Sequence, residues 1–216
     1  MSTDKEQTDP LGKRTERRRG GFKQERAVRT EAQILSAAAD EFAHKGFYDV
    51  TLADIAEQAG VTKGAVYFHY ANKEAIALAV SKEYYVRLEV LFGEVKALGL
   101  PPLQSTAELL TRTAAALLQD RTFQAAVRLQ IDLFLVDSRL PTPFVSFIDA
   151  VTDLLTEAKA LGQLAEGSDP AVLARVLVAA LYGAQHISWV LHGRTDVVDR
   201  VREVIEVVIP GGVRQA

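Results

Sequence analysis

The chain has 216 residues, 48% of them hydrophobic and 25% charged, with a formal net charge of −3 at pH 7. This is the composition of a globular protein built from one large domain, or from a small domain joined to a larger one. There is no cysteine, which excludes disulfides, thiolate zinc sites and cysteine nucleophiles. The four histidines lack metal-ligand spacing supported by nearby carboxylates, so we expect neither a metal site nor a cofactor.

The first 24 residues are polar and basic. They have no apolar periodicity and contain Gly20-Gly21, so we predict a disordered basic arm over residues 1–24. The chain begins without an apolar stretch, so we expect no secretory signal and a cytoplasmic protein. Two interpretations of the arm stay open: it reaches DNA phosphates or the minor groove, or it is a solvated tail without a role. Its basic residues, with those just beyond it, are Lys13, Arg14, Arg17, Arg18, Arg19, Lys23, Arg26 and Arg29, set against Glu16 and Glu25.

After the arm, apolar residues recur at helical spacing and convincing period-two alternation is missing. A first helix passes through Phe42 and ends at Lys45-Gly46. Capping residues mark later starts at Thr51 (with Asp54 in a capping box), Thr62 and Asn72, and each of Thr142-Pro143 and Asp169-Pro170 places a cap before a proline. We therefore predict an all-α protein of nine helices, the last five near 103–119, 121–138, 143–161, 170–192 and 196–209.

Residues 25–71 form the first predicted domain. In the segment TLADIAEQAGVTKGAVYFHY, small Ala56 permits close helix crossing, Gly60 makes the turn, and Val61 and Val66 pack the second short helix, which we draw through Val66 and Phe68. This pattern predicts a helix-turn-helix whose second helix enters the major groove of DNA. A small helical corner with solvated polar residues fits the same spacing, but the basic flank favours DNA binding.

Residues 30–80 resemble the N-terminal domain of TetR-family regulators. The elements F-x-x-x-G-[FY], T-x-x-x-I-A, A-G-V-[ST]-x-G and Y-x-[HY]-[FY]-x-x-K-E all occur in order. The resemblance implies a homodimer on a palindromic operator in double-stranded DNA. It also implies DNA contacts from Thr51, Lys63, Tyr67, His69 and Lys73, with Thr62, Gly64 and Ala65 completing the groove-facing surface.

Residues 72–216 form the second predicted domain, for effector binding and dimerisation. Within the family the chain is most similar to the γ-butyrolactone-type autoregulator receptors of antibiotic-producing actinomycetes, on T-K-G-A-V-Y-F-H-Y-A-N-K-E-A, Ala126-x-Arg128-Leu129-Gln130, Leu140-Pro141-x-Pro143-Phe144 and Gly183-x-Gln185-His186. The resemblance implies a repressor of antibiotic or secondary-metabolism genes, released by a γ-butyrolactone, butenolide or furan. The ligand-binding residues that we predict are Tyr85, Gln130, Phe144, Phe147 and Gln185.

The effector residues allow a second interpretation. Gln130 lies in an apolar stripe and is either a satisfied core amide or a ligand contact, and Phe144 and Phe147 are either plain core or a pocket wall. Related receptors often carry tyrosine at position 144 and tryptophan at position 147, so altered specificity and loss of effector binding both stay open. Tyr85 and Lys73 are predicted on one helix, about 18 Å apart. An effector that binds Tyr85 would therefore tilt this helix and move the part of the protein that contacts DNA.

The segment Ala171–Leu191 is apolar nearly all round but is interrupted by Arg175, Gln185 and His186. A charge near mid-bilayer costs about 2.5–3.5 kcal/mol on insertion scales, so we expect no membrane span. A helix apolar on all sides needs cover on all sides. We predict that a second copy supplies part of it in a four-helix dimer interface, with Trp189 at the edge.

Three other functions compete with this interpretation. An enzyme is disfavoured because the chain has no nucleophile elbow, phosphate loop, Glu-x-x-His pair or H-E-x-x-H motif. A sequence-independent architectural DNA protein is disfavoured by the net acidity and the large apolar second half. A TetR-type repressor of a drug efflux gene, with a promiscuous hydrophobic pocket, differs from an autoregulator receptor only through the resemblance.

Overall fold

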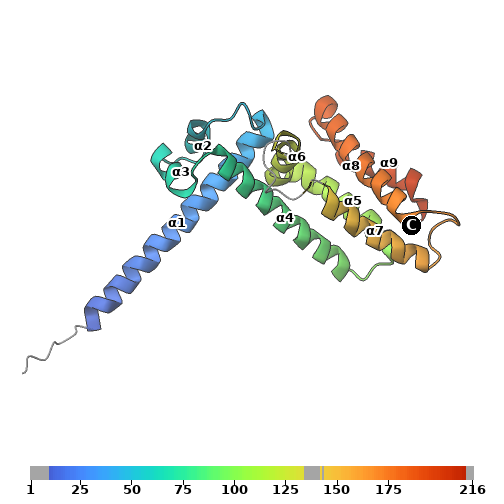
Figure 1. The fold of residues 1–216 in the computed structure, drawn as a ribbon, viewed down its shortest axis with the longest axis horizontal. Helices are drawn as coiled ribbons and strands as arrows, with labels where there is room; N and C mark the ends of the chain where they lie inside the picture. Colours follow the sequence, from blue (N-terminus) through green and yellow to red (C-terminus); the bar gives the residue numbers. More distant parts are fainter. Residues whose placement is uncertain (1–9, 134–141, 143, 213–216) are drawn as a thin grey trace, which may run out of the picture.

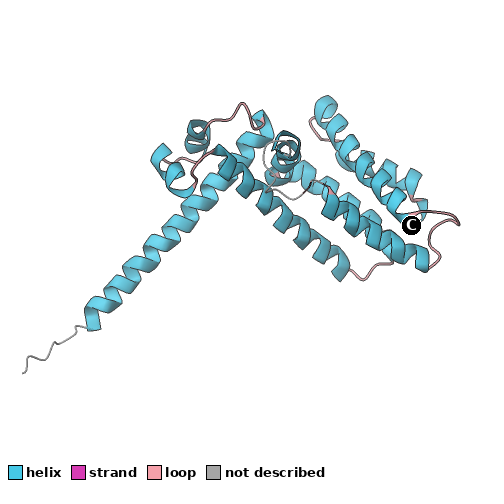
Figure 2. Ribbon diagram, in the orientation of Figure 1, coloured by secondary structure: helices cyan, strands magenta, loops and turns pink. Residues whose placement is uncertain are grey.

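The computed structural model describes residues 10–133, 142 and 144–212, and its regular elements are all helical (Figure 2). The prediction of an all-α protein with nine helices is confirmed over these residues. The helices are α1 (Pro10–Lys45), α2 (Leu52–Gln58), α3 (Lys63–His69), α4 (Lys73–Ala97), α5 (Pro102–Gln119), α6 (Arg121–Leu133), α7 (Val145–Ala160), α8 (Pro170–His192) and α9 (Val197–Val208), followed by a short 3-10 turn (Pro210–Gly212).

Helix α1 is longer than predicted and extends out of the body of the protein as a single rod of about 54 Å (Figure 1). Residues 10–24 are therefore helical, and the prediction of a disordered arm is wrong for them; residues 1–9 lie outside the described part. Each glycine of Gly20-Gly21 costs a helix about 1 kcal/mol relative to alanine. The surrounding Lys, Arg, Gln and Glu are good helix formers, and they continue a helix already nucleated by its packed second half.

Four of the predicted helix caps are confirmed, those at Thr51, Thr62, Asn72 and Asp169. Thr51 Oγ1 accepts a hydrogen bond from the Asp54 amide at 3.2 Å, and Asp54 Oδ2 accepts one from the Thr51 amide at 2.8 Å, which completes the capping box. Thr62 and Asn72 accept from the amides three residues ahead, at 3.2 and 2.8 Å. Asp169 Oδ1 accepts from two amides of α8, and Pro170 is the first residue of that helix. Local sequence thus sets these helix starts.

The start of α7 differs from the prediction. The helix begins at Val145, two residues later than predicted, and Phe144 takes the N-cap position with a left-handed φ of 69° and no side-chain cap. Thr142 instead offers its carbonyl to the Val145 amide at 3.5 Å. Pro143, the motif residues Leu140-Pro141 and the end of the predicted helix 121–138 lie outside the described residues.

Two hydrophobic cores divide the molecule, and α4 contributes to both. Its first half, with Ile76 and Val80, packs into the core of α1–α3, whereas Tyr84, Leu88 and Val95 pack into the core of the C-terminal helices. Helix α6 lies across the junction and packs against both α1 and α4. Its Ala125 and Leu129 belong to the first core. A displacement of α4 or α6 therefore changes the packing of both cores.

Among the described helices, only α8 has the length and the apolar composition of a membrane-spanning helix. Its buried stripe, which includes Leu177, Leu181 and Ser188, packs against α7 and α9. The same length and composition occur in the core helices of soluble proteins.

Candidate nucleic-acid interface and effector site

Helices α2 and α3 meet at a tight turn. Gly60 adopts a left-handed φ of 64°, and the Val61 amide donates to the Ala56 carbonyl at 3.0 Å. Ala56 and Val66 are buried at the crossing of the two helices. This is the predicted helix-turn-helix arrangement, and it presents the opposite face of α3 to solvent.

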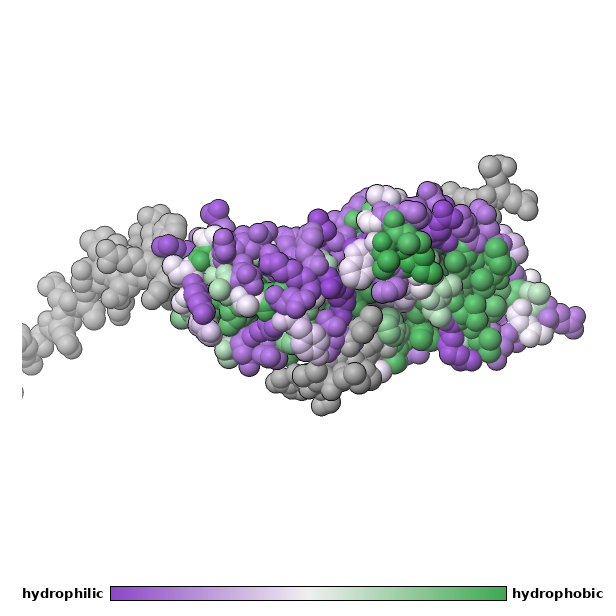
Figure 3. Space-filling view, turned by 90° about the horizontal axis from the view of Figure 1, so that it is seen from above, coloured by the Kyte–Doolittle hydropathy of each residue, from purple (hydrophilic) through white to green (hydrophobic). Residues whose placement is uncertain are grey.

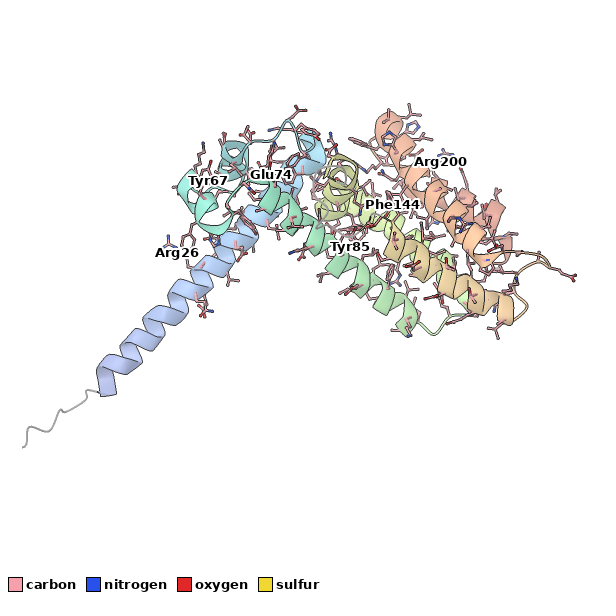
Figure 4. All side chains as sticks on the ribbon, in the orientation of Figure 1. Arg26, Tyr67, Glu74, Tyr85, Phe144 and Arg200 are labelled. Atoms are coloured by element: carbon pink, nitrogen blue, oxygen red, sulfur yellow. The ribbon has the colours of Figure 1, made fainter. Side chains whose placement is uncertain are left out.

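The side chains predicted to meet DNA lie largely on that solvent face. Thr51, Thr62, Lys63 and Gly64 are exposed, Tyr67 is 51% exposed, and Ala65 and His69 are half-buried. Figure 4 shows Tyr67 on α3, on the side of the helix-turn-helix away from the C-terminal helices. A Cβ built on Gly64 would meet only the Thr62 hydroxyl, at 3.9 Å. The fold itself therefore does not require glycine there, and the bare backbone is free for close approach by a ligand.

Phe68 was not among the residues predicted on the outward face of α3, yet the structure places it there. Its side chain is 80% exposed. Successive residues of a helix are turned by about 100°, so two residues separated by two positions point about 200° apart and cannot both face inward. Phe68 joins the outer surface next to His69, whose ring lies 5.1 Å away edge-on. Helical periodicity counted from Val66 could have found it.

Lys73 has an internal role that the resemblance did not imply. Its ammonium group donates to the carbonyl oxygens of Phe47 at 2.7 Å and Val50 at 2.8 Å and lies 4.5 Å from the centre of the Phe47 ring. These bonds hold the loop that leads from α1 to the Thr51 cap. Contact of Lys73 with DNA stays a prediction, and so do the other DNA contacts. Of the basic residues near the arm, Arg26 (Figure 4) and Arg29 are exposed on α1.

Four of the five predicted effector residues come together in the C-terminal part. Tyr85 and Phe144 lie between α4 and α7 in Figure 4. Aromatic contacts run through this group: the ring centres of Tyr84 and Tyr85 are 5.1 Å apart, and Phe144 and Phe147 lie 4.6 and 6.4 Å from Tyr182. We name the group of Tyr84, Tyr85, Phe92, Phe123, Gln130, Phe144, Phe147 and Tyr182 the aromatic cluster.

Gln130 is the polar member that approaches two tyrosines of this cluster. Burial raises the pKa of the Tyr84 hydroxyl to about 12 and also raises that of Tyr85, while hydrogen bonding to Gln130 partly opposes both shifts. The Gln130 residue is only 6% exposed, and its Oε1 atom has no hydrogen-bond partner. An amide oxygen buried without a partner costs about 1–3 kcal/mol, so the cluster holds an unmet acceptor.

Sequence reasoning missed Tyr182. Its hydroxyl oxygen lies 3.0 Å from that of Tyr84, and burial raises its pKa well above the usual value. The signal available was spacing, because Tyr182 precedes Gln185 by one helical turn on the inner face of α8. Gln185 itself is buried further along that face, between Leu181 and Ser188, and its Oε1 also has no partner. Its place in the effector site stays a prediction.

A hollow of about 400 Å³ adjoins the aromatic cluster at Phe92, whose ring centre is 5.7 Å from that of Phe147. A second hollow, of about 860 Å³, lies between α1, α4, α5 and the start of α6. Ion pairs such as Arg87 with Asp120 at 2.6 Å and Arg121 with Asp40 at 3.5 Å line it, and it includes none of the predicted effector residues. In the described residues, no cluster of His, Asp and Glu suits a metal ion.

The outer side of α8 carries an uncovered apolar stripe. We call this surface the α8 stripe. It consists of Val172, Val176, Ile187, Val190 and Leu191 of α8 and Val207 of α9. Figure 3 shows apolar side chains gathered over the C-terminal helices, away from the helix-turn-helix end. Trp189, predicted at the edge of this surface, stacks against Arg128 and Arg194, and its place at the edge of a dimer interface stays a prediction.

Comparison with known proteins agrees with this geometry. Residues 34–80 match the sequence profile described as bacterial regulatory proteins, tetR family. The A-factor receptor protein of Streptomyces griseus is 35% identical over 188 residues, which are 87% of this chain and 65% of the receptor. The chain thus spans about two thirds of that relative's length.

Two solved structures extend the comparison. A protein studied for the molecular basis of control of antibiotic production by bacterial hormones is 41% identical, covers 85% of this chain and 97% of its own, and has a TM-score of 0.77. The TetR family protein CprB of Streptomyces coelicolor is 30% identical, covers 88% of this chain and 91% of its own, and has a TM-score of 0.78. CprB has also been solved in complex with its biological operator sequence. The chain belongs to the TetR family of bacterial regulatory proteins.

Proposed function

We propose that the chain is a homodimeric, cytoplasmic transcriptional repressor that binds a palindromic operator through α3. A small signalling molecule of the γ-butyrolactone, butenolide or furan type releases it, and the genes it controls belong to antibiotic or secondary metabolism. The similarity to the A-factor receptor and to the hormone-controlled regulator supports this choice of effector and of target genes. The proposal assigns the chain no catalytic step.

The observation that carries the proposal is the course of α4. This helix begins at Lys73, which holds the loop before the helix-turn-helix. About three turns further on, it supplies Tyr84 and Tyr85 to the aromatic cluster. A ligand that separates the rings of α4 from those of α8 displaces α4, and α4 is packed into the core of α1–α3. If the effector binds the displaced conformer better, it shifts the population away from the DNA-binding one.

The α8 stripe supports a dimer. Two copies that place their α8 and α9 helices side by side form a four-helix interface, and a twofold axis makes each stripe cover the other. Such a dimer presents two α3 helices, which must reach major grooves about 34–36 Å apart or a multiple of that distance. A small tilt of α4 in each subunit is then enough to misplace both.

Tyr182 supports an effector-binding protein in spite of the phenylalanine at position 144. Related receptors often place a tyrosine hydroxyl at that position, and this chain places one on the neighbouring ring, 4.6 Å away. The hydroxyls of Tyr84, Tyr85 and Tyr182, together with the Gln130 amide, offer convergent polar groups in an apolar surround, as small-ligand sites do.

The test begins with selection of duplexes from a random pool by the full-length protein. We expect a palindrome bound about a thousandfold more tightly than random DNA at physiological salt. Fluorescence anisotropy with that duplex then measures release by γ-butyrolactones, butenolides, furan carboxylates and lipophilic cationic drugs. Release by one of the first three classes supports the proposal, and release by drugs alone supports an efflux-gene repressor. Equal affinity for palindromic and random duplexes would contradict sequence-specific repression.

A further inference from the structure

A second polar cluster lies apart from the aromatic cluster, where α8 turns into α9. Arg194 follows the helix cap Gly193 and takes a left-handed φ of 71°, and its amide is tied back to the Ser188 carbonyl at 3.1 Å. The residue is only 6% exposed, yet its Nε and Nη2 atoms have no hydrogen-bond partner. The effector and DNA sites described above leave this guanidinium without a role.

Among the residues that the structure describes, the charged groups that act on Arg194 are the cations of Arg128 and Arg121. Its guanidinium lies 4.7 Å from the centre of the Trp189 ring, and the guanidinium of Arg128 lies 4.8 Å from the same ring. Burial, followed by the charges of Arg128 and Arg121, lowers the pKa of Arg194 to about 10. Arg121 already pairs with Asp40, and nearby Asp196 accepts hydrogen bonds from Ser188 and Arg200.

A buried guanidinium stays charged at neutral pH, so it cannot escape its cost by losing a proton. Taking such an ion out of water costs several kcal/mol unless a counter-charge and hydrogen bonds offset the loss. Stacking on Trp189 recovers about 0.5–2 kcal/mol of it. The two unpartnered donors of Arg194 form a planar fork of the kind that matches the oxygens of a carboxylate or a phosphate.

We propose that Arg194 and Arg128, stacked on Trp189, form a binding site for a small oxyanion, a carboxylate or a phosphate. The anion accepts the free Nε–H and Nη2–H bonds of Arg194 and neutralises the like charges of the two guanidinium groups. This site is distinct from the aromatic cluster, and its existence does not depend on the identity of the effector.

The site is placed to affect DNA binding, because Arg128 holds the end of α1. Its Nη1 donates to the carbonyls of Ala43 at 3.1 Å and His44 at 2.7 Å, and a Cβ on Gly46 would come within 2.7 Å of its Nη2. An anion that draws Arg128 toward Arg194 competes with these carbonyls for the same donors. The end of α1 leads directly into the loop before Thr51, so anion binding changes how the helix-turn-helix is held. This second step rests on the proposed function.

Titration of the full-length dimer tests the site. Arginine side chains labelled with ¹⁵N report their Nε–H groups by NMR, and the Arg194 signal is identified by its loss in Arg194→Met. We add sodium phosphate, sodium acetate or sodium chloride at constant ionic strength. We expect a saturable shift of the Arg194 signal with phosphate, acetate or both, and none with chloride; the salt that acts distinguishes a phosphate ligand from a carboxylate ligand. Absence of a saturable shift with either oxyanion would overturn the site.

Thermal unfolding of matched variants gives an independent readout. The active oxyanion should raise the Tm of the wild type and of Arg202→Met, whose arginine is exposed on α9 and pairs with Asp199. It should leave the Tm of Arg194→Met unchanged, and an equal rise in that variant would contradict the proposal. If Arg194→Met fails to fold, the charge-conserving variant Arg194→Lys removes the same Nε–H signal and identifies it, so the NMR titration of the wild type still decides. For the second step, saturating anion should change operator affinity about fivefold or more. No change would refute the coupling to DNA while leaving the site.

Discussion

The hydroxyl oxygens of Tyr84 and Tyr182 lie 3.0 Å apart, although the two residues are 98 positions apart in the chain. The contact joins α4, which reaches the helix-turn-helix, to α8, which carries the exposed apolar stripe. Burial raises the pKa of Tyr84 to about 12 and that of Tyr182 well above its usual value, so both hydroxyls keep their protons at neutral pH. A ligand that accepts a hydrogen bond from either one can break the contact and loosen α4 from α8.

Replacing Tyr182 with phenylalanine should weaken effector binding about tenfold, because a buried polar group of the ligand then loses its partner at a cost of about 1–3 kcal/mol. Isothermal titration calorimetry with the effector found in the release assay measures this change. Tyr70→Phe is the matched control, since Tyr70 is buried in the core of α1–α3 and should leave effector affinity unchanged. Equal effector affinity in Tyr182→Phe and the wild type would remove Tyr182 from the site.

Replacing Lys63 with alanine should lower operator affinity and reduce the slope of log affinity against log salt by about one, as loss of one phosphate contact does. Anisotropy titrations at several salt concentrations give the slope. Lys159→Ala removes an exposed lysine from the far end of α7 and should change neither quantity. A Lys63→Ala slope equal to that of the wild type would mean that Lys63 makes no phosphate contact.

Replacing Lys73 with methionine should destabilise the fold by about 1.5–3 kcal/mol, because the carbonyls of Phe47 and Val50 lose a charged donor. Urea unfolding measures the loss. The salt slope of operator binding should remain that of the wild type if the internal bonds are the whole role of Lys73. A slope reduced by about one with unchanged stability would instead assign Lys73 to the DNA backbone.

The Thr51 cap makes stability depend on acid pH. Hydrogen bonds from the Thr51 side chain and backbone hold the pKa of Asp54 below its usual 3.8. A carboxylate whose pKa is lowered by folding stabilises the protein above its unfolded pKa, and this contribution is lost as the pH falls through the lower, folded value. Asp54→Asn should therefore flatten the pH dependence of unfolding below about pH 4. Thr51→Val should flatten it too, and urea midpoints that fall with acid as steeply as in the wild type would speak against this role.

Replacing Val190 with glutamate should raise the dimer dissociation constant about a hundredfold or more, because burying an unpaired carboxylate in the α8 stripe costs several kcal/mol. Sedimentation velocity across a concentration series measures the effect. Leu161→Glu places the same charge at another exposed apolar position, at the end of α7, and should leave the dimer intact. Dissociation by both variants alike, or by neither, would show that α8 is not the interface.

Much of the fold could be predicted because its signals are local. Thr51, Thr62, Asn72 and Asp169 cap helices by bonds to amides two or three residues ahead, so the relevant partners lie within one turn of the sequence. The errors were local as well. The length of α1 was underestimated at Gly20-Gly21, and Phe68 was left out of the predicted outward face of α3 although the helical repeat alone would have placed it there.

Local patterns in the chain were enough to predict an all-α protein, the position of the helix-turn-helix and the family, because caps, periodicity and a motif depend on neighbouring residues. Long-range packing was needed to reveal that Tyr182 meets Tyr84, that Lys73 holds the Phe47 loop and that two donors of the buried Arg194 have no partner. The energy of a buried polar group depends on which distant groups packing brings within about 3 Å. No pattern of nearby residues contains that information.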